Sequence, residues 1–158
     1  MFDRKLKSGR ALAAIVRRLQ RSGKKVVFTN GCFDLMHYGH AKYMEEAKSH
    51  GDVLVVAVNS DASVRRLKGR GRPIVKALYR AKLVASLESV DYVVIFGEDT
   101  PLSLIRRLKP DVLVKGADWA AGEIAGAGFV KRRGGKIVRV KLVKGLSTTQ
   151  LIKRIAHA

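Results

Sequence analysis

Short runs of β-branched and other apolar residues alternate along this chain with segments whose apolar residues recur every three or four positions. Most of the runs are apolar at successive positions, which is typical of strands buried on both faces of a parallel sheet. Strands that alternate with helices favour an open α/β sheet. We therefore expect a Rossmann-like, doubly wound parallel sheet with helices on both faces. The expected strands are 25–28, 53–58, 92–96, 112–114 and 136–140.

Residues at the ends of the helix-like segments support their limits. Asp99 and Thr100 stand before Pro101, which predicts a capped helix start with proline in the first turn. The dipeptide Lys109-Pro110 predicts the end of the same helix. The expected helices are roughly 9–21, 40–49, 61–67, 78–89, 101–108, 124–133 and 148–156.

The length of 158 residues and the absence of a Ser/Gly-rich or proline-rich linker predict one domain over residues 1–158. Within it we expect a helical extension over 1–24 and a catalytic core over 25–158. The apolar runs are too short to span a bilayer, and no apolar leader follows Met1. With Cys32 as the single cysteine, no internal disulfide is possible. We expect a soluble, cytoplasmic protein without a membrane partner.

The chain is strongly basic, with 32 Lys and Arg against 13 Asp and Glu, a formal net charge of +19. Residues 62–87 and 124–158 contain no acidic residue, and residues 4–25 form a third basic stretch. Such a charge predicts an anionic partner. Aromatic residues are only 6% of the chain, and no zinc-ligand spacing is present. The charge alone leaves two readings open, a nucleic-acid surface and a small phosphorylated ligand.

Two histidines, His37 and His40, follow the first expected strand where the chain turns into a helix. Gly39 between them permits a tight turn and close approach of the backbone to a ligand. The free amides at a helix start attract anions, and imidazoles beside them are able to donate hydrogen bonds to phosphate oxygens. The alternative is a capped helix start with two incidental histidines. The pairing after a buried strand favours a functional site.

The run Thr-Asn-Gly-Cys-Phe-Asp-Leu-Met-His-Tyr-Gly-His at 29–40 resembles the signature of the cytidylyltransferase-like nucleotidyltransferases. That family's pattern is a strand followed by T/N-G-x-F-D-x-x-H-x-G-H. Within the family, the chain is most similar to the ADP-heptose synthase group. Because no kinase domain precedes the matching part of the given sequence, the resemblance implies the stand-alone transferase rather than the fused bifunctional enzyme. The stretches that extend the resemblance are 57–63, 66–69, 72–74, Arg80, 114–119 and 145–149.

The resemblance implies a Rossmann-like nucleotidyltransferase that transfers AMP from ATP to a sugar 1-phosphate, here a heptose 1-phosphate. The products are an ADP-sugar and pyrophosphate, and no covalent intermediate is formed. His37 and His40 are the implied catalytic residues. Mg²⁺ is implied as the cofactor that accompanies ATP, with no metal ligand assigned to the chain. A homodimer is expected by the same analogy.

The resemblance also implies binding residues. For the nucleotide they are Thr29, Asn30, Gly31, Phe33, Gly39, Lys115, Gly116, Asp118, Ser147, Thr148 and Thr149. For the acceptor and the phosphates they are Asp34, Lys68, Arg72, Arg80 and Trp119. Some of these residues have a structural alternative. Ser147 with Gln150 also fits a capping box, Asp34 also fits a turn-stabilising residue, and the loop 68–73 also fits a solvated surface.

Alternatives to this function remain open at the level of the sequence. One is a CTP-dependent cytidylyltransferase that acts on another phosphorylated alcohol. Leu142 counts against cytidine and glycerol phosphate as substrates, because the glycerol-phosphate branch of the family carries arginine at that place. The other alternative is a basic nucleic-acid-binding module. The P-loop and dinucleotide patterns are both absent, which disfavours those phosphate-binding classes.

Overall fold

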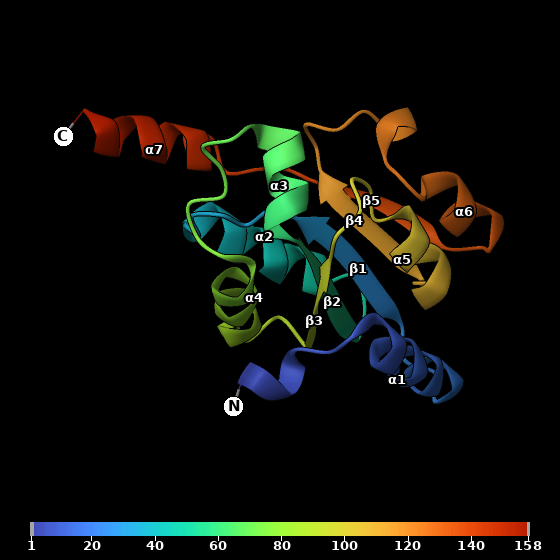
Figure 1. Cartoon of the computed structure of the whole chain (residues 1–158). Helices are drawn as coiled ribbons and strands as arrows, with labels where there is room; N and C mark the ends of the chain where they lie inside the picture. Colours follow the sequence, from blue (N-terminus) through green and yellow to red (C-terminus); the bar gives the residue numbers. More distant parts are fainter. Residues whose placement is uncertain (1, 158) are drawn as a thin grey trace.

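Five parallel strands form one sheet in the computed structural model, which describes residues 2–157 of the chain (Figure 1). The strands lie in the order β3-β2-β1-β4-β5, so the chain winds outward from β1 in both directions. This order confirms the predicted doubly wound α/β fold. The strands are β1 (Val26–Gly31), β2 (Val53–Asn59), β3 (Tyr92–Phe96), β4 (Val112–Gly116) and β5 (Lys136–Val140).

The helices follow the predicted order, and most lie within a few residues of the predicted limits. They are α1 (Gly9–Arg21), α2 (Tyr38–Lys48), α3 (Asp61–Lys68), α4 (Ala77–Ser86), α5 (Leu102–Leu108), α6 (Ala127–Arg132) and α7 (Thr148–Ala156). Two 3₁₀ helices, η1 (Phe2–Lys5) and η2 (Ala121–Glu123), complete the described elements.

Two helix starts differ from the prediction. The helix expected over 124–133 starts only at Ala127, because Gly126 before it adopts a left-handed conformation with φ of 84°. At the start of α5, Pro101 is itself the cap residue and no side chain caps the helix. Asp99, predicted to help cap this helix, instead accepts a hydrogen bond from Arg66 Nε at 2.6 Å.

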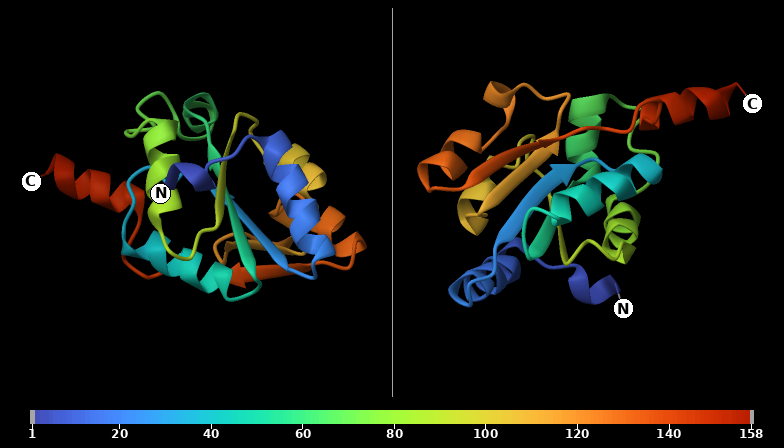
Figure 2. Two further views of the ribbon diagram at one scale, coloured as in Figure 1. Left: turned by 90° about the horizontal axis from the view of Figure 1, so that it is seen from below. Right: turned by 180° about the vertical axis from the view of Figure 1, so that it is seen from behind.

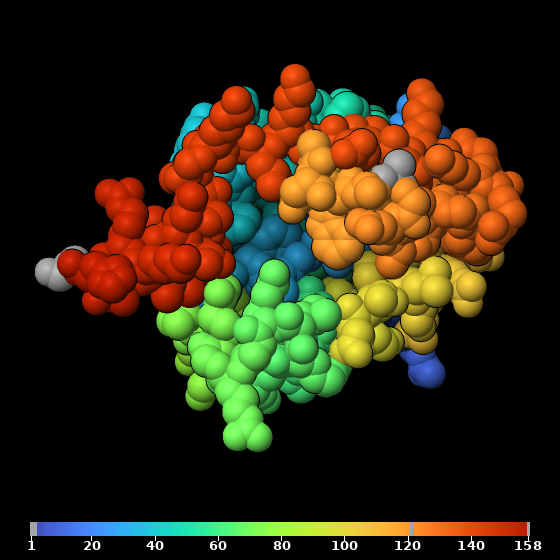
Figure 3. All heavy atoms as spheres, turned by 90° about the horizontal axis from the view of Figure 1, so that it is seen from above, coloured from blue at the N-terminus to red at the C-terminus, as the bar shows by residue number. Residues whose placement is uncertain are grey.

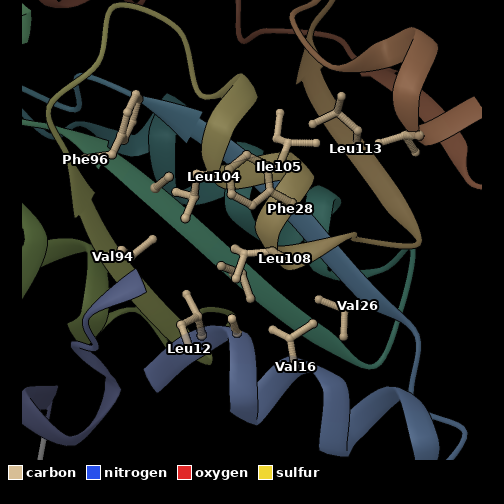
Figure 4. Close-up of a cluster of buried hydrophobic side chains, with 14 of the residues drawn as sticks. Leu12, Val16, Val26, Phe28, Val94, Phe96, Leu104, Ile105, Leu108 and Leu113 are labelled. Atoms are coloured by element: carbon tan, nitrogen blue, oxygen red, sulfur yellow. The ribbon is translucent and has the colours of Figure 1, made fainter. Parts of the chain in front are cut away.

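The helices cover both faces of the sheet (Figure 2). One hydrophobic cluster joins α1, α5 and α6 to the sheet, and the other joins α2 and α4 to the opposite face. Phe28 belongs to the first cluster and its neighbour Val27 to the second, because successive strand residues point to opposite faces. Figure 4 shows the first cluster, in which Leu12 and Val16 of α1 face the sheet. Full burial of each such side chain contributes about 1.5–3 kcal/mol.

Helix α1 lies in the stretch 1–24, which the sequence predicts to be a helical extension. In the structure it is part of the helical layer, since Leu12 and Val16 are completely buried. Its Gln20 side chain also donates hydrogen bonds to Lys109 O and Asp111 Oδ2, in the segment between α5 and β4. The outer limits of the predicted domain, Met1 and Ala158, lie outside the described residues. Among residues 2–157, no helix has both the length and the apolar character that crossing a membrane requires.

The strand order reverses between β1 and β4, and these two strands part toward their carboxyl ends. They pair only at Val27 with Val112 and at Phe28 with Leu113. By contrast, β1 pairs with β2 along all six of its residues. The backbone after Phe28 is therefore free to separate from that after Leu113. In open α/β sheets, ligands bind in the crevice that such a reversal creates.

Candidate active site

A cavity of about 640 Å³ lies at the carboxyl ends of β1 and β4. Figure 3 looks into it from above, as a hollow whose floor is the blue segment of the chain and whose rim is green, yellow, orange and red. All the predicted site residues except Thr29 and Arg80 line it. The structure thus brings together the signature after β1, the Lys-Gly-x-Asp-Trp stretch after β4, and the start of α7.

His37 and His40 stand together at the beginning of α2, on the cavity wall. His37 is the cap residue of the helix, and its ring centroid lies 4.0 Å from that of His40. The backbone amide of His37 donates a hydrogen bond to His40 Nδ1 at 3.4 Å. Because Nδ1 accepts this bond, the proton of the neutral ring is on Nε2. His40 therefore has a donor at the outer end of its ring.

Both imidazoles are held in the neutral form. Burial, reinforced by the neighbouring His37, lowers the pKa of His40 to about 4. Burial also lowers the pKa of His37. The Nδ1 atom of His37 is buried and has no hydrogen-bond partner within the described residues. A buried polar atom without a partner is rare in a folded protein, so this atom indicates a place where a ligand completes the site.

The pKa of His40 predicts how stability depends on pH. An unfolded chain takes up a proton on this histidine near pH 6.5, whereas the folded chain resists it until about pH 4. Stability should therefore fall as the pH drops through this window. The His40→Asn variant has no imidazole at this position, so the part of the stability loss that His40 causes in this pH window should be absent from it. Urea unfolding at pH 7 and pH 4.5 measures it, and an equal loss in both proteins would contradict the burial of a neutral His40.

Glycine and aromatic residues fix the positions of the two histidines. A Cβ at Gly39 would lie 3.0 Å from both Cε1 and Nδ1 of His37, so any larger residue there would force that ring to shift. Phe33 packs edge-on against His40 with centroids 5.6 Å apart. The backbone φ of Phe33 is 47°, in the left-handed region, which costs a non-glycine residue about 1–3 kcal/mol. Gly31 leaves room for the Phe33 ring, since a Cβ at position 31 would lie only 2.8 Å from Cζ of Phe33.

Asp34 fastens the loop between α3 and α4 to the signature. Its carboxylate is completely buried and accepts hydrogen bonds from the amides of Ile74 and Val75, each at 2.9 Å. It also pairs with Arg72 Nε at 2.5 Å. Burial alone would raise the pKa of Asp34, but the two amides and Arg72 together lower it. Asp34 therefore stabilises the loop, and it also lines the cavity together with Arg72 and Lys68.

The two predicted residues that do not line the cavity lie behind its wall. Arg80 has no exposed surface and donates to Cys32 O, Val75 O and Asp61 Oδ1. Its guanidinium is used to join the signature to the loop before α4, so it is not placed to bind a phosphate. Thr29 is also fully buried, and its hydroxyl bonds to that of Tyr43 at 2.8 Å.

Lys115 crosses the gap between the parted strands. Its Nζ donates to the carbonyl oxygen of Asn30 at 3.3 Å and lies 4.9 Å from the centroid of the Trp119 ring. Burial lowers the pKa of Lys115 to about 8, an effect that Asp118 partly offsets. Asn30 Oδ1 is a second buried atom without a partner among the described residues. The floor of the cavity therefore presents a cation, an unpaired amide oxygen and an aromatic ring.

The start of α7 closes the remaining side. Ser147 Oγ accepts a hydrogen bond from the amide of Gln150 at 3.1 Å, which confirms the predicted cap. Thr148 Oγ1 donates to Leu35 O at 3.3 Å and so ties the helix to the signature. Ser147, Thr148 and Thr149 all line the cavity. The first amides of α7 and those of α2 thus lie on one cavity, where two helix dipoles favour an anion.

The chain matches the family model described as cytidylyltransferase-like over residues 28–154. That match includes the signature, both histidines and most of α7. The chain belongs to the cytidylyltransferase-like family.

Relatives in this family match almost the whole chain. The bifunctional protein HldE of Geobacter metallireducens is 53% identical over 156 residues, which are 99% of this chain and 32% of that protein. The protein of the same name from Gluconobacter oxydans is 55% identical over 146 residues, 92% of this chain and 30% of that protein. The chain therefore spans about a third of the length of these curated relatives.

Two solved structures share the fold. A lipopolysaccharide core biosynthesis protein from Thermoplasma volcanium is 31% identical, with a TM-score of 0.67 over 77% of this chain and 100% of that chain. The pantoate–β-alanine ligase of Francisella tularensis, solved in complex with β-γ ATP and β-alanine, has a TM-score of 0.61. It covers 97% of this chain and 78% of that chain, and at 15% identity it is similar in fold alone.

Some residues of the cavity are not foreseen from the family signature. Tyr43 lies on the wall one turn of α2 after His40, a spacing that places two residues on one helix face. Burial raises the pKa of Tyr43, so its hydroxyl stays protonated. The loop before α5 supplies Asp99, Thr100 and Pro101 to the opposite wall. No sequence signal distinguishes that loop from an ordinary turn.

Proposed function

We propose that the protein transfers a nucleotidyl group from a nucleoside triphosphate to a sugar 1-phosphate. A phosphate oxygen of the sugar attacks the α-phosphorus, the bond to the β-phosphate breaks, and pyrophosphate leaves. The observation that supports this most is the neutral pair His37 and His40 at the start of α2, inside a cavity at the strand reversal. Such chemistry needs positioning and charge stabilisation rather than a nucleophile on the protein.

In this proposal different parts of the cavity wall bind different parts of the two substrates. The triphosphate lies along the amide ends of α2 and α7, where helix dipoles stabilise its charge. His40 donates from Nε2 to a phosphate oxygen whose charge grows in the transition state. Lys68 and Arg72 on the opposite wall neutralise the phosphates, and Lys115 and Trp119 contact the base or the sugar. Half-buried Cys32 takes no part in this proposal, because burial raises its pKa and keeps the thiol protonated.

We further propose ATP as the donor and a heptose 1-phosphate as the acceptor, with an ADP-sugar as the product. The relatives named HldE and the lipopolysaccharide core biosynthesis protein support a sugar phosphate as the acceptor. The direct test is a pyrophosphate-release screen of ATP, CTP, GTP and UTP against sugar and polyol phosphates. Turnover with ATP and a heptose 1-phosphate supports the proposal. Turnover only with CTP and another phosphorylated alcohol would replace it with a cytidylyltransferase.

The divalent cation is proposed to enter with the triphosphate. Among residues 2–157 no group of three His, Cys, Asp or Glu side chains is placed to hold a metal ion. The Asp34 carboxylate is already occupied by two amides and Arg72. The cavity therefore fits a magnesium–triphosphate complex rather than bare Mg²⁺, with Asn30 and Asp118 as the available oxygen donors. Bound Mg²⁺ would offset phosphate charge and hold the leaving pyrophosphate.

We also propose a homodimer, in which α7 is part of the interface. No residue of α7 is buried, and the helix extends away from the rest of the molecule (Figures 1 and 2). Its Ile155 has 68% of its surface exposed, and Tyr38 at the start of α2 has 65%. A second copy packed against these side chains would bury apolar surface that is exposed in the single chain.

Ile155→Asp is expected to weaken this dimer at least about 30-fold, because a carboxylate would be buried in the interface. Light scattering behind size-exclusion chromatography at several protein concentrations measures the effect. A wild-type protein that stays monomeric at high concentration would contradict the proposal, as would a variant that dimerises like the wild type.

A further inference from the structure

The side of the molecule formed by α1, α5 and α6 is densely positive. We call it the basic helical face, and define it as the Lys and Arg residues of α1, of α5 with its cap Lys109, and of α6 with its cap Arg133. It holds ten basic residues and no acidic one. All ten are exposed. Within residues 2–157, none of them forms an ion pair or lines the large cavity.

The three helices form one continuous layer. A Cβ at Gly9 of α1 would lie 3.5 Å from Nη1 of Arg107 on α5, and one at Gly126 before α6 would lie 2.8 Å from Ile105. Helix α1 packs on β3 and β1, whereas α6 packs on β4 and β5. The layer thus spans all five strands, a width of about 19 Å at a strand spacing of about 4.8 Å. Figure 2 shows these helices on one face of the sheet.

The composition of the face indicates the kind of anion. Eight of the ten residues are Arg, whose planar guanidinium binds phosphate with two parallel hydrogen bonds. The large apolar residues exposed in the described part of the chain all lie outside α1, α5 and α6. Helices that bind bilayers insert such residues, and proteins that bind single strands stack bases on aromatic rings. Binding to the phosphate backbone of a duplex requires neither exposed apolar residues nor aromatic rings.

We propose that the basic helical face binds the phosphate backbone of double-stranded nucleic acid without reading its sequence. A duplex carries one charge per about 1.7 Å, so about 19 Å of its axis presents about eleven phosphates. One face of the protein reaches about half of them. With about five phosphates neutralised, the logarithm of the binding constant should fall with the logarithm of salt concentration with a slope of about −4 to −5.

The test uses a 24-base-pair DNA duplex and fluorescence anisotropy between 50 and 200 mM NaCl. The face variant carries R17Q, R21Q, R106Q and R132Q. Its control carries K141Q, K144Q, K153Q and R154Q, which removes the same charge from the acid-free C-terminal segment. We expect the face variant to bind at least about 30-fold more weakly at 50 mM NaCl, with a salt slope reduced by about three to four units. The control should stay within about threefold of the wild type.

Equal losses in the two variants would overturn the proposal, because net charge alone would then explain binding. Failure of the wild type to bind the duplex at 50 mM NaCl would also overturn it. So would tighter binding to vesicles with 30% phosphatidylglycerol, lost in the same face variant, since the partner would then be a membrane. Pyrophosphate release should be unchanged in the face variant, because none of its four residues lines the cavity. The binding result is therefore independent of the proposed nucleotidyl transfer.

Discussion

Replacing His40 with alanine is expected to lower kcat for nucleotidyl transfer by about two to four orders of magnitude. The His40 ring accepts the His37 amide at Nδ1, which leaves Nε2–H as a neutral donor on the cavity wall. A neutral donor that is fixed before the substrate arrives is more effective in a water-poor site than a flexible one, because no reorganisation is needed. Binding of the nucleotide should change less than kcat, since other groups of the wall also contact the phosphates.

His50→Ala is the matched control for this variant. His50 lies just beyond the other end of α2, and it does not line the cavity. The kcat of His50→Ala should stay within about twofold of the wild type, and circular dichroism should show that both variants are folded. If His40→Ala released pyrophosphate at a rate close to that of the wild type, the proposed role of the histidine pair would be wrong.

Replacing Asp34 with alanine is expected to lower the free energy of unfolding by about 3–5 kcal/mol. The change leaves the amides of Ile74 and Val75 without their acceptor and leaves Arg72, which has only 17% of its side chain exposed, without its partner. The loop before α4 should also lose its fixed position, so KM for the triphosphate should rise more than kcat falls. Urea unfolding and steady-state kinetics measure the two effects.

Asp99→Ala provides the comparison for Asp34. Asp99 forms an ion pair of similar length with Arg66, but both side chains are about half exposed, at 59% and 49%. An exposed pair contributes at most about 1 kcal/mol, so this variant should unfold at nearly the wild-type urea concentration. A similar, small loss in both variants would show that the buried carboxylate of Asp34 does not hold the loop.

The order of strands and helices was predictable because it depends on local patterns. Five apolar runs and the helix periodicity between them are properties of neighbouring residues, and the parallel sheet follows from their alternation. The place of the site was predictable for the same reason, since ligands bind where the strand order reverses. His37 and His40 are three residues apart on one helix start, so their proximity needs no knowledge of the tertiary structure.

The partners of Asp34 and Arg80 were not predictable, because they are distant in the sequence. Arg80 lies 48 residues from Cys32, whose carbonyl it binds, and Arg72 lies 38 residues from Asp34. From the sequence alone, an arginine that forms a buried structural ion pair cannot be distinguished from an arginine that binds a phosphate. The late start of α6 depends in turn on the positive φ of Gly126 and on its contact with Ile105.

The most direct measurement of the central proposal follows the α-phosphate itself. ATP labelled at the α-phosphorus is incubated with Mg²⁺ and heptose 1-phosphate, using wild-type protein, His40→Ala and His50→Ala. We expect wild-type and His50→Ala proteins to move the label into a nucleotide sugar with one pyrophosphate per product, and His40→Ala to do so at least about a hundredfold more slowly. Label that moves equally fast in all three proteins, or that never reaches any sugar phosphate of a tested panel with any of the four nucleotides, would contradict the proposal.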